Sequence, residues 1–260
     1  MTTDINIQEP NIQDIYSRNE LYWGHEAQCE LFKKHVAVFG LGGVGGYAVD
    51  ALARSGVGNF TLVDFDSVSA SNINRQLIAS IPNIGRAKTD LMRERINSIN
   101  PHIRVNTVKD FYTTGLNGIF DGGNIDYVVD AIDTLKYKID LIETCVKKQI
   151  PIISSMGAGN RIDPSKLYVA DILDVKPGKC PFVKNVLSKL KLIGIDKGLT
   201  VVTSSEKPFI LEKTSSIDTV TTQSGEEITL TKFTPASTPF VPPVAGYLMA
   251  SYIVRDFIGL

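Results

Sequence analysis

Apolar and polar positions change in blocks along residues 35–157, and these blocks fit buried strands that alternate with amphipathic helices. A continuous apolar run such as HVAVFG is typical of a strand covered on both faces. The predicted strands cover residues 35–40, 59–66, 103–109, 125–133 and 151–156. The predicted helices cover residues 43–55, 85–100 and 135–149. The alternation predicts a Rossmann-like, doubly wound α/β fold with a mostly parallel sheet and helices on both faces.

The pattern differs on either side of this region. Residues 1–15 are polar and predicted to form a flexible arm, followed by one or two short helices over residues 16–34. After residue 157 the pattern predicts two sheet-extending strands that we expect to be antiparallel, a basic helix, an exposed hairpin turning at Ser224 and Gly225, and an apolar helix. The two strands are predicted at 167–173 and 199–205, and the basic helix at 181–193. The hairpin covers 209–234, and the apolar helix covers 243–258. We expect one domain over residues 16–260, with a nucleotide-binding part at 35–157 and a substrate-binding part at 158–260.

Charge and cysteine content narrow the functional classes. A net charge of −1 argues against bulk electrostatic attraction to nucleic acid, although a local basic patch stays open. No two cysteines form a C-x-x-C pair, so the sequence predicts neither a disulfide framework nor a structural zinc site. The polar N-terminus without an apolar leader favours the cytoplasm. We expect the apolar helix at 243–258 to pack within the fold, with peripheral membrane contact as the alternative.

A glycine-rich loop follows the first predicted strand. Gly40, Gly42 and Gly45 form G-x-G-x-x-G between a strand and a helix, where backbone amides and the helix dipole can hold phosphates. Asp64, at the end of the next strand, suits a pair of ribose hydroxyls. NAD and ATP both carry such a ribose, so the loop and Asp64 indicate a nucleotide without choosing between hydride transfer and phosphate chemistry.

Three charged residues near the ends of successive strands favour phosphate chemistry. Arg75 can bind phosphate oxygens with both arms of its guanidinium, and Lys88 at a helix start needs an anion nearby. Asp130 and Asp133 both lie at the end of the fourth predicted strand, where a carboxylate commonly holds Mg²⁺. The alternatives are solvated surface positions for Arg75 and Lys88 and a helix N-cap for Asp133. Their joint placement favours adenylyl or phosphoryl transfer over an NAD(P)-dependent oxidoreductase.

The stretches GLGGVGG, DFDSVSASNINRQ, GRAKTD and DAIDT resemble the adenylating domain of the ubiquitin-activating-type (ThiF-type) superfamily, whose members use ATP and Mg²⁺ to convert a carboxylate into an acyl-adenylate. The nucleotide-binding positions implied are Gly40, Gly42, Gly43, Val44, Gly45, Asp64, Asp66, Asn74, Arg75, Gln76, Lys88 and Asp133. The catalytic positions implied are Arg18, Arg75, Lys88 and Asp133. Asp133 would hold Mg²⁺ through ATP, and Arg18 would reach the partner's site in a homodimer.

The later stretches PIISSMGAGNRIDP, VVTSSEKP and STPFVPPVAGYLMAS resemble the branch of tRNA threonylcarbamoyladenosine dehydratases. This resemblance implies ATP-dependent activation of the carboxylate of threonylcarbamoyl-adenosine in tRNA, followed by cyclisation with net loss of water. Lys184, Lys189 and Lys191 would then contact tRNA, the alternative being a solvated helix face. The paired C-x-x-C zinc ligands usual in activators of sulfur carriers are missing.

Other functional classes stay open at this point. The alternative with the same chemistry is adenylation of the C-terminal glycine of a ubiquitin-like sulfur carrier. A non-catalytic nucleotide-binding scaffold is a further alternative. A bound monovalent cation and a cysteine desulfurase or sulfur-acceptor partner are also left open.

Overall fold

The computed structural model describes residues 12–260 apart from 123, 177, 179, 211–214, 224 and 234. Most of the predicted N-terminal arm and Ser224 of the predicted hairpin turn therefore lie outside the described residues. The last four residues of the predicted arm form a short helix, α1 (Ile12–Ile15).

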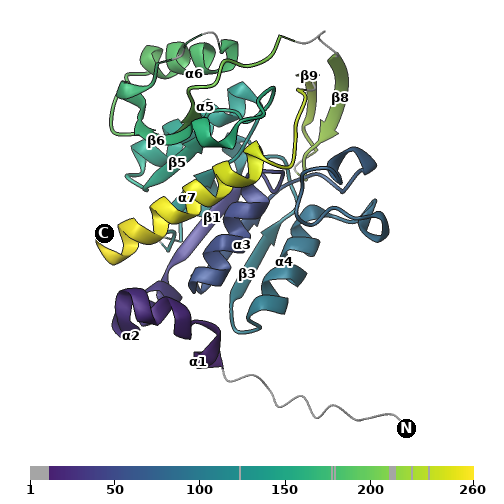
Figure 1. The fold of residues 1–260 in the computed structure, drawn as a ribbon. Coiled ribbons are helices and arrows are strands. Elements are labelled where there is room, and N and C mark those ends of the chain that lie inside the picture. Colours follow the sequence, from purple (N-terminus) through teal and green to yellow (C-terminus); the bar gives the residue numbers. More distant parts are fainter. Residues whose placement is uncertain are drawn as a thin grey trace.

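Seven strands form one sheet in the order β3-β2-β1-β4-β5-β7-β6 (Figure 1). They are β1 (His35–Phe39), β2 (Asn59–Val63), β3 (Arg104–Val108), β4 (Tyr127–Asp130), β5 (Ile152–Ser155), β6 (Leu167–Asp171) and β7 (Thr200–Ser204). All neighbouring pairs are parallel except β6 with β7. This confirms the predicted parallel sheet with an antiparallel extension from the C-terminal part.

Helices cover both faces of the sheet, as the alternation of strands and helices predicted (Figure 1). The remaining helices are α2 (Ser17–Lys33), α3 (Gly45–Ser55), α4 (Lys88–Ile99), α5 (Leu135–Lys147), α6 (Pro181–Leu192) and α7 (Val241–Ile258). Successive side chains of β1 point to opposite faces: Val36 and Val38 join the core beneath α3, α4 and α7, whereas Ala37 and Phe39 join the core beneath α5 and α6. Both cores are apolar, which is why β1 is a continuous apolar run.

The strand order reverses beside β1, and this reversal creates the site. From β1 the chain moves to β2 and β3 on one side, and later to β4 and β5 on the other. The connections on the two sides cross opposite faces of the sheet, so the loops at the carboxyl ends of β1 and β4 diverge. A crevice forms between these loops, which is where open α/β sheets bind ligands.

The predicted hairpin forms from β8 (Ser215–Thr221) and β9 (Glu227–Phe233). Its tip is anchored to the end of β3, because the Asp110 carboxylate accepts the backbone N–H of Gln223 at 3.3 and 3.2 Å from its two oxygens. Ile228 of β9 is buried in the core beneath α5. Other hairpin residues such as Thr221 and Glu227 are exposed, so the expectation of an exposed hairpin is confirmed there and wrong only where the Asp110 carboxylate and Ile228 dock it onto the sheet.

Helix α7 confirms that the apolar C-terminal stretch packs within the fold. Ala245, Met249 and Ile253 are buried in the core that α7 shares with α3. Gly246 permits a close approach, because a Cβ atom there would overlap the carbonyl oxygen of Val44 at the start of α3. Among the described residues, no helix has both the length and the apolar character needed to cross a membrane.

Candidate active site

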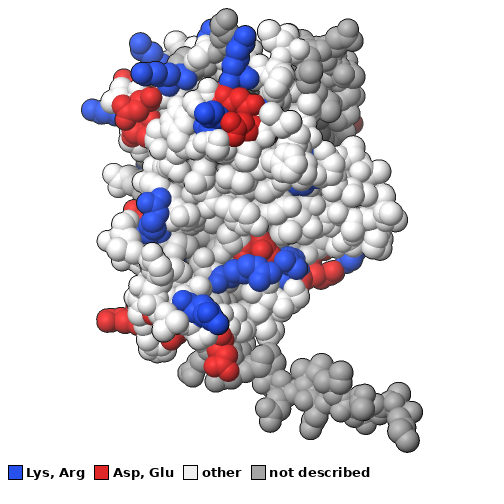
Figure 2. All heavy atoms as spheres, in the orientation of Figure 1, with Lys and Arg blue, Asp and Glu red and all other residues white. Residues whose placement is uncertain are grey.

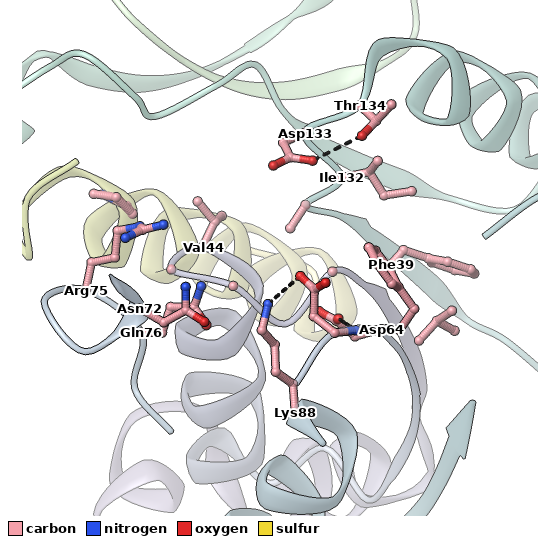
Figure 3. Close-up of a pocket in the computed structure, with 18 of the residues that line it drawn as sticks. Phe39, Val44, Asp64, Asn72, Arg75, Gln76, Lys88, Ile132, Asp133 and Thr134 are labelled. Carbon is pink, nitrogen blue, oxygen red and sulfur yellow. Dashed lines mark hydrogen bonds and ion pairs between the residues drawn. The ribbon is translucent and has the colours of Figure 1, made fainter. Parts of the chain in front are cut away.

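A cavity of about 530 Å³ occupies the crevice at the carboxyl ends of β1, β2 and β4 (Figure 3). Ten of the twelve residues predicted to bind nucleotide line it, and the exceptions are Gly45 and Asn74. The volume lies within the range usual for sites that enclose a small molecule. The fold thus brings together most of the residues that the sequence grouped.

The glycine loop is tight because its glycines meet one another. Gly40 has a φ of +90°, a backbone conformation that residues with a side chain rarely adopt. A Cβ atom on Gly45 would overlap the carbonyl oxygen of Gly40. A Cβ on Gly43 would lie 3.1 Å from Cβ of Pro242 and 3.3 Å from the carbonyl oxygen of Arg75. Gly45 therefore shapes the turn from beneath, and the N-terminus of α3 supplies a partial positive charge suited to phosphate.

Asp64 at the end of β2 is buried and tied to the loop on either side. One carboxylate oxygen accepts the backbone N–H of Leu41 at 2.6 Å, and the other accepts that of Asp66 at 2.8 Å. Burial raises the pKa of Asp64 above its usual value, although the nearby Lys88 ammonium opposes this shift. The carboxylate therefore fixes the glycine loop against β2.

Lys88 is the first residue of α4 and is only 4% exposed, so its alternative as a solvated surface lysine is wrong. Its Nζ lies 2.8 Å from Oδ2 of Asp66. Burial alone would lower the pKa of Lys88, but attraction to Asp64, Asp66 and Asp133 outweighs burial and raises it. Lys88 therefore stays protonated around neutral pH and presents a cation inside the cavity.

Arg75 and Gln76 enter the cavity from the stretch that follows β2. The Arg75 guanidinium donates to the Ser71 carbonyl oxygen at 2.8 Å and to Oδ1 of Asn74 at 2.9 Å. Gln76 is 7% exposed, and its Oε1 is buried without a hydrogen-bond partner in the described part of the chain. A buried acceptor without a hydrogen bond costs free energy, so the unpaired Oε1 favours a ligand or a water molecule bound at this point of the cavity. Asn74 instead donates to the Ser237 carbonyl oxygen at 2.9 Å.

Asp130 and Asp133 have different surroundings. Asp130 is fully buried, and its Oδ2 lies 2.6 Å from both Nζ of Lys138 and Oγ of Ser154. Its Oδ1 accepts the backbone N–H of Ile132 at 3.0 Å, which fixes the turn leading to Asp133. Asp133 is exposed in the cavity, and α5 begins after Thr134 without a side-chain cap, so the alternative of Asp133 as the N-cap is wrong.

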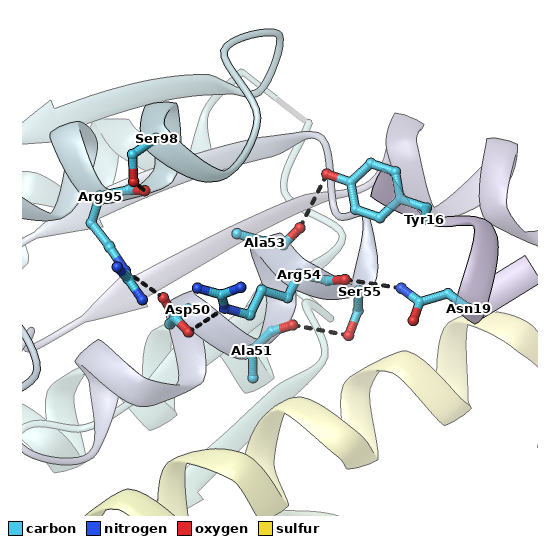
Figure 4. A network of polar contacts seen from close by, with 9 residues as sticks. All are labelled: Tyr16, Asn19, Asp50, Ala51, Ala53, Arg54, Ser55, Arg95 and Ser98. Atoms are coloured by element: carbon cyan, nitrogen blue, oxygen red, sulfur yellow. Dashed lines mark hydrogen bonds and ion pairs between the residues drawn. The ribbon is translucent and has the colours of Figure 1, made fainter. Parts of the chain in front are cut away.

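Arg18 lies in the first turn of α2, far from the cavity of its own chain. Its neighbours contact the C-terminal end of α3: Oη of Tyr16 donates to the Ala53 carbonyl oxygen at 3.2 Å, and Asn19 donates to that of Arg54 at 2.9 Å (Figure 4). The glycine loop is at the other end of α3, about 16 Å away for its eleven residues. A role for Arg18 in catalysis therefore requires a second copy of the chain.

The three lysines predicted to contact tRNA lie on α6. Lys184, Lys189 and Lys191 are exposed, whereas Val183 and Val186 pack into the core. Helix α6 lies at the top of the molecule in the view of Figure 1, and basic side chains gather in the same region in Figure 2, beside acidic ones. The helix is thus amphipathic and presents its cations to solvent.

Sequence reasoning missed part of the cavity lining. Asp110, Phe111 and Tyr112 line it from the end of β3, and Pro235 and Ser237 line it from the segment after β9. The first three could have been found, because they follow a predicted parallel strand at its carboxyl end. The latter two carried no such signal, since only the folded chain brings residues so distant in sequence to the glycine loop.

Comparison with known proteins agrees with the nucleotide-binding site that the geometry indicates. Residues 16–185 match the ThiF family. The chain belongs to the ThiF family. The resemblance inferred from the glycine loop and the charged stretches after it is thereby confirmed, and the chain is an adenylating enzyme of this family.

Among ThiF-family relatives, tRNA threonylcarbamoyladenosine dehydratase of Bacillus subtilis is 44% identical over 243 residues, which are 94% of each chain. The crystal structure of Escherichia coli tRNA N6-threonylcarbamoyladenosine dehydratase, TcdA, in complex with ATP matches with a TM-score of 0.81 at 30% identity and covers 95% of each chain. Molybdopterin-synthase adenylyltransferase of Escherichia coli is 33% identical over 157 residues, or 57% of this chain and 59% of that one. None of these three relatives is named as an oxidoreductase.

Proposed function

We propose that this enzyme uses ATP to activate the carboxylate of threonylcarbamoyl-adenosine in tRNA and then closes the ring with net loss of water. The observation that carries the proposal is the match to a tRNA threonylcarbamoyladenosine dehydratase over 94% of both chains. The cavity supports it, since it brings together the predicted triphosphate-binding residues of a ThiF-family enzyme. A structurally similar dehydratase, TcdA, has been crystallised with ATP.

The chemistry divides into two steps. First, a carboxylate oxygen of the modified nucleoside attacks the α-phosphorus of ATP, and pyrophosphate leaves. A nucleophile on the same nucleoside then attacks the activated carbonyl carbon, AMP leaves with that oxygen, and the ring closes. The guanidinium of Arg75 and the ammonium of Lys88 would offset negative charge that develops on the phosphates. Holding nucleophile and electrophile in one molecule favours the second step through proximity.

Magnesium fits the residues present. Asp133 offers one exposed carboxylate at the cavity, and no group of three metal-ligating side chains occurs within the described residues. Mg²⁺ commonly takes one or two carboxylates together with substrate phosphates, so Asp133 would hold it through ATP. The ion would neutralise phosphate charge, and the protein residues would supply orientation.

The tRNA and a homodimer complete the proposal. The exposed lysines Lys184, Lys189 and Lys191 offer cations to the phosphate backbone. Since Arg18 is remote from its own cavity, we propose that it enters the site of a second copy in a homodimer. Each subunit would then lend one arginine to its partner.

A second candidate is adenylation of the C-terminal glycine of a ubiquitin-like sulfur carrier. The observation in its favour is the 33% identity to a molybdopterin-synthase adenylyltransferase. That match covers 57% of this chain, against 94% for the dehydratase, and therefore ranks second. A carrier protein that stimulates ATP–pyrophosphate exchange where tRNA does not would reverse this order.

The decisive experiment is mass spectrometry of nucleosides from tRNA that carries threonylcarbamoyl-adenosine. Incubation with enzyme, ATP and Mg²⁺ should convert the nucleoside to a species lighter by one water, with AMP and pyrophosphate formed. Omitting ATP should prevent the conversion, and the Asp133→Ala variant serves as the matched protein control. If wild-type enzyme with ATP and Mg²⁺ leaves the nucleoside mass unchanged, the substrate assignment is refuted.

A further inference from the structure

The cavity lining is divided by charge. Its charged side chains, within the part of the chain described, all precede α5: Asp64, Asp66, Arg75, Lys88, Asp110 and Asp133. The rest of the lining includes Ala158 and Gly159 after β5 and Pro235 and Ser237 after β9, which carry no charge. A triphosphate with its metal ion would pair with the charged part. Uncharged lining before α5, such as Phe39 and Phe111, can cover the nucleoside of ATP, which leaves the uncharged segments after β5 and β9 for the acceptor, the molecule whose carboxylate attacks the α-phosphorus.

The segment at 235–237 is held against the loop after β5 by Asn160. The Asn160 backbone N–H donates to the Ala236 carbonyl oxygen at 2.8 Å, and its side-chain Oδ1 accepts the Ala236 N–H at 2.8 Å. Both polar backbone groups of Ala236 are thus satisfied by one residue. Beside it, a Cβ on Gly159 would lie only 2.6 Å from Cβ of Pro235, so the two segments meet without an intervening side chain.

The backbone of Asn160 is adapted to this pairing. Its φ is +58°, in the left-handed region that non-glycine residues rarely adopt and that asparagine tolerates better than most. Its carbonyl oxygen also accepts the Phe209 N–H at 2.8 Å. Asn160 therefore forms its hydrogen bonds to Ala236 and Phe209 in a backbone conformation that costs free energy. Such a conformation is typical of a position constrained by function.

A second contact ties the same segment to the charged lining. Asn74 donates from Nδ2 to the Ser237 carbonyl oxygen at 2.9 Å, while its Oδ1 accepts from Arg75. The segment is thus fixed at Ala236 by the loop after β5 and at Ser237 by the stretch that carries Arg75. These two contacts together set the distance between the 235–237 segment and the predicted phosphate-binding residues.

We infer that Asn160 is a positioning residue which, by pairing with Ala236, fixes the 235–237 segment as the acceptor-binding wall of the site. The inference rests on the proposed function for the identity of the acceptor. It assigns Asn160 no contact with ATP, and it predicts that loss of its side-chain oxygen affects acceptor binding selectively.

Two variants separate the side chain from the backbone. Asn160→Gly keeps the positive φ but removes Oδ1, whereas Asn160→Asp keeps an oxygen acceptor and tolerates the same backbone. We expect Asn160→Gly to raise KM for the modified tRNA by about tenfold, as expected for the loss of a hydrogen bond and of the order that it imposes on the segment. KM for ATP should change less than about twofold, and Asn160→Asp should recover most of the acceptor affinity.

Hydrogen exchange supplies a readout that needs no substrate. The Ala236 amide should be protected in wild type and in Asn160→Asp and should exchange faster in Asn160→Gly, with melting temperatures confirming that each variant is folded. Unchanged exchange in Asn160→Gly would overturn the positioning role. Faster exchange with an unchanged KM for tRNA, or an equal rise in KM for ATP, would overturn the assignment of this wall to the acceptor.

The two proposals fail in different ways. If wild-type enzyme removes no water from the modified tRNA, the proposed function is refuted, while hydrogen exchange still decides whether Asn160 positions the segment. ATP binding by wild type and Asn160→Gly, measured by titration calorimetry, then tests the predicted independence of the nucleotide part. A loss of ATP affinity in Asn160→Gly would overturn that independence.

Discussion

Asp130 and Asp133 illustrate what the residue scale adds to the sequence. Both end the same predicted strand, and the strand-end rule assigns either of them to the site. The structure separates them because Lys138, eight residues further along the chain in α5, pairs with Asp130 in a fully buried contact. An interaction of this kind depends on side-chain length and burial, which periodicity does not report. Asp133 is left as the carboxylate that faces the cavity.

Arg75→Ala and Asp133→Ala should each reduce ATP-dependent turnover by at least about 100-fold, because the proposed function assigns each charge to the phosphates or their metal ion. Neither side chain belongs to the apolar core, so melting temperatures should stay close to that of wild type. Pyrophosphate release measures the turnover. Arg93→Ala, which removes a half-buried arginine paired with Asp90 outside the cavity, is the matched control and should retain wild-type rates. Near-normal turnover in either site variant would show that the triphosphate lies elsewhere.

At the scale of elements, most strands and helices follow from the hydrophobic pattern. The apolar run of β1 and the amphipathic run of α4 were each predicted within a few residues of their bounds. The docking of the hairpin was not, because it depends on Asp110 meeting a backbone amide more than 100 residues away. The pattern of a hairpin predicts its own pairing, whereas its partner depends on the rest of the fold.

Helix α7 supports the glycine loop, and Gly246→Ala should reveal this. The added methyl group would overlap the Val44 carbonyl oxygen, so the two helices must separate. We expect a loss of about 1–3 kcal/mol in the free energy of unfolding, as for other overpacked sites. ATP affinity should fall with it, because Val44 lines the cavity. Urea unfolding and calorimetric titration with ATP measure the two effects.

Gly122→Ala is the matched control for this prediction. Gly122 has open space around the position of an added Cβ, and its φ lies outside the range that disfavours side chains. The variant should therefore leave both the free energy of unfolding and ATP affinity unchanged. A Gly246→Ala protein as stable as wild type would contradict the close contact between α3 and α7.

Helix α6 should contribute to tRNA binding through its exposed lysines. Charge reversal of Lys184, Lys189 and Lys191 to glutamate should weaken tRNA binding and reduce the salt slope of the logarithm of affinity by roughly 0.9 for each phosphate that the helix no longer neutralises. Reversal of Lys33, Lys147 and Lys148, exposed at the ends of α2 and α5, is a control with the same change in charge. Equal affinities for wild type and the α6 variant would refute the role of this helix.

At the scale of the whole molecule, Arg18 distinguishes a complete site from an incomplete one. Arg18→Ala and Arg75→Ala should each be inactive alone. In the proposed homodimer, exchange of subunits between the two variants makes half of the dimers mixed, and each mixed dimer has one site with both arginines intact. We therefore expect recovery of about a quarter of wild-type activity, as two-fold symmetry dictates. Pyrophosphate release measures it, and mixtures that remain inactive would show that Arg18 acts in no partner site.

The position of α7 also bears on when the protein becomes able to bind its nucleotide. The glycine loop is translated early, yet it rests on Gly246, and Pro242 closes part of the same cavity. A nascent chain that has not yet released residues 241–258 lacks both supports. We therefore expect affinity for ATP to arise only after residues 241–258 have been synthesised and packed, so that chains cut before these residues neither hold nor consume the nucleotide.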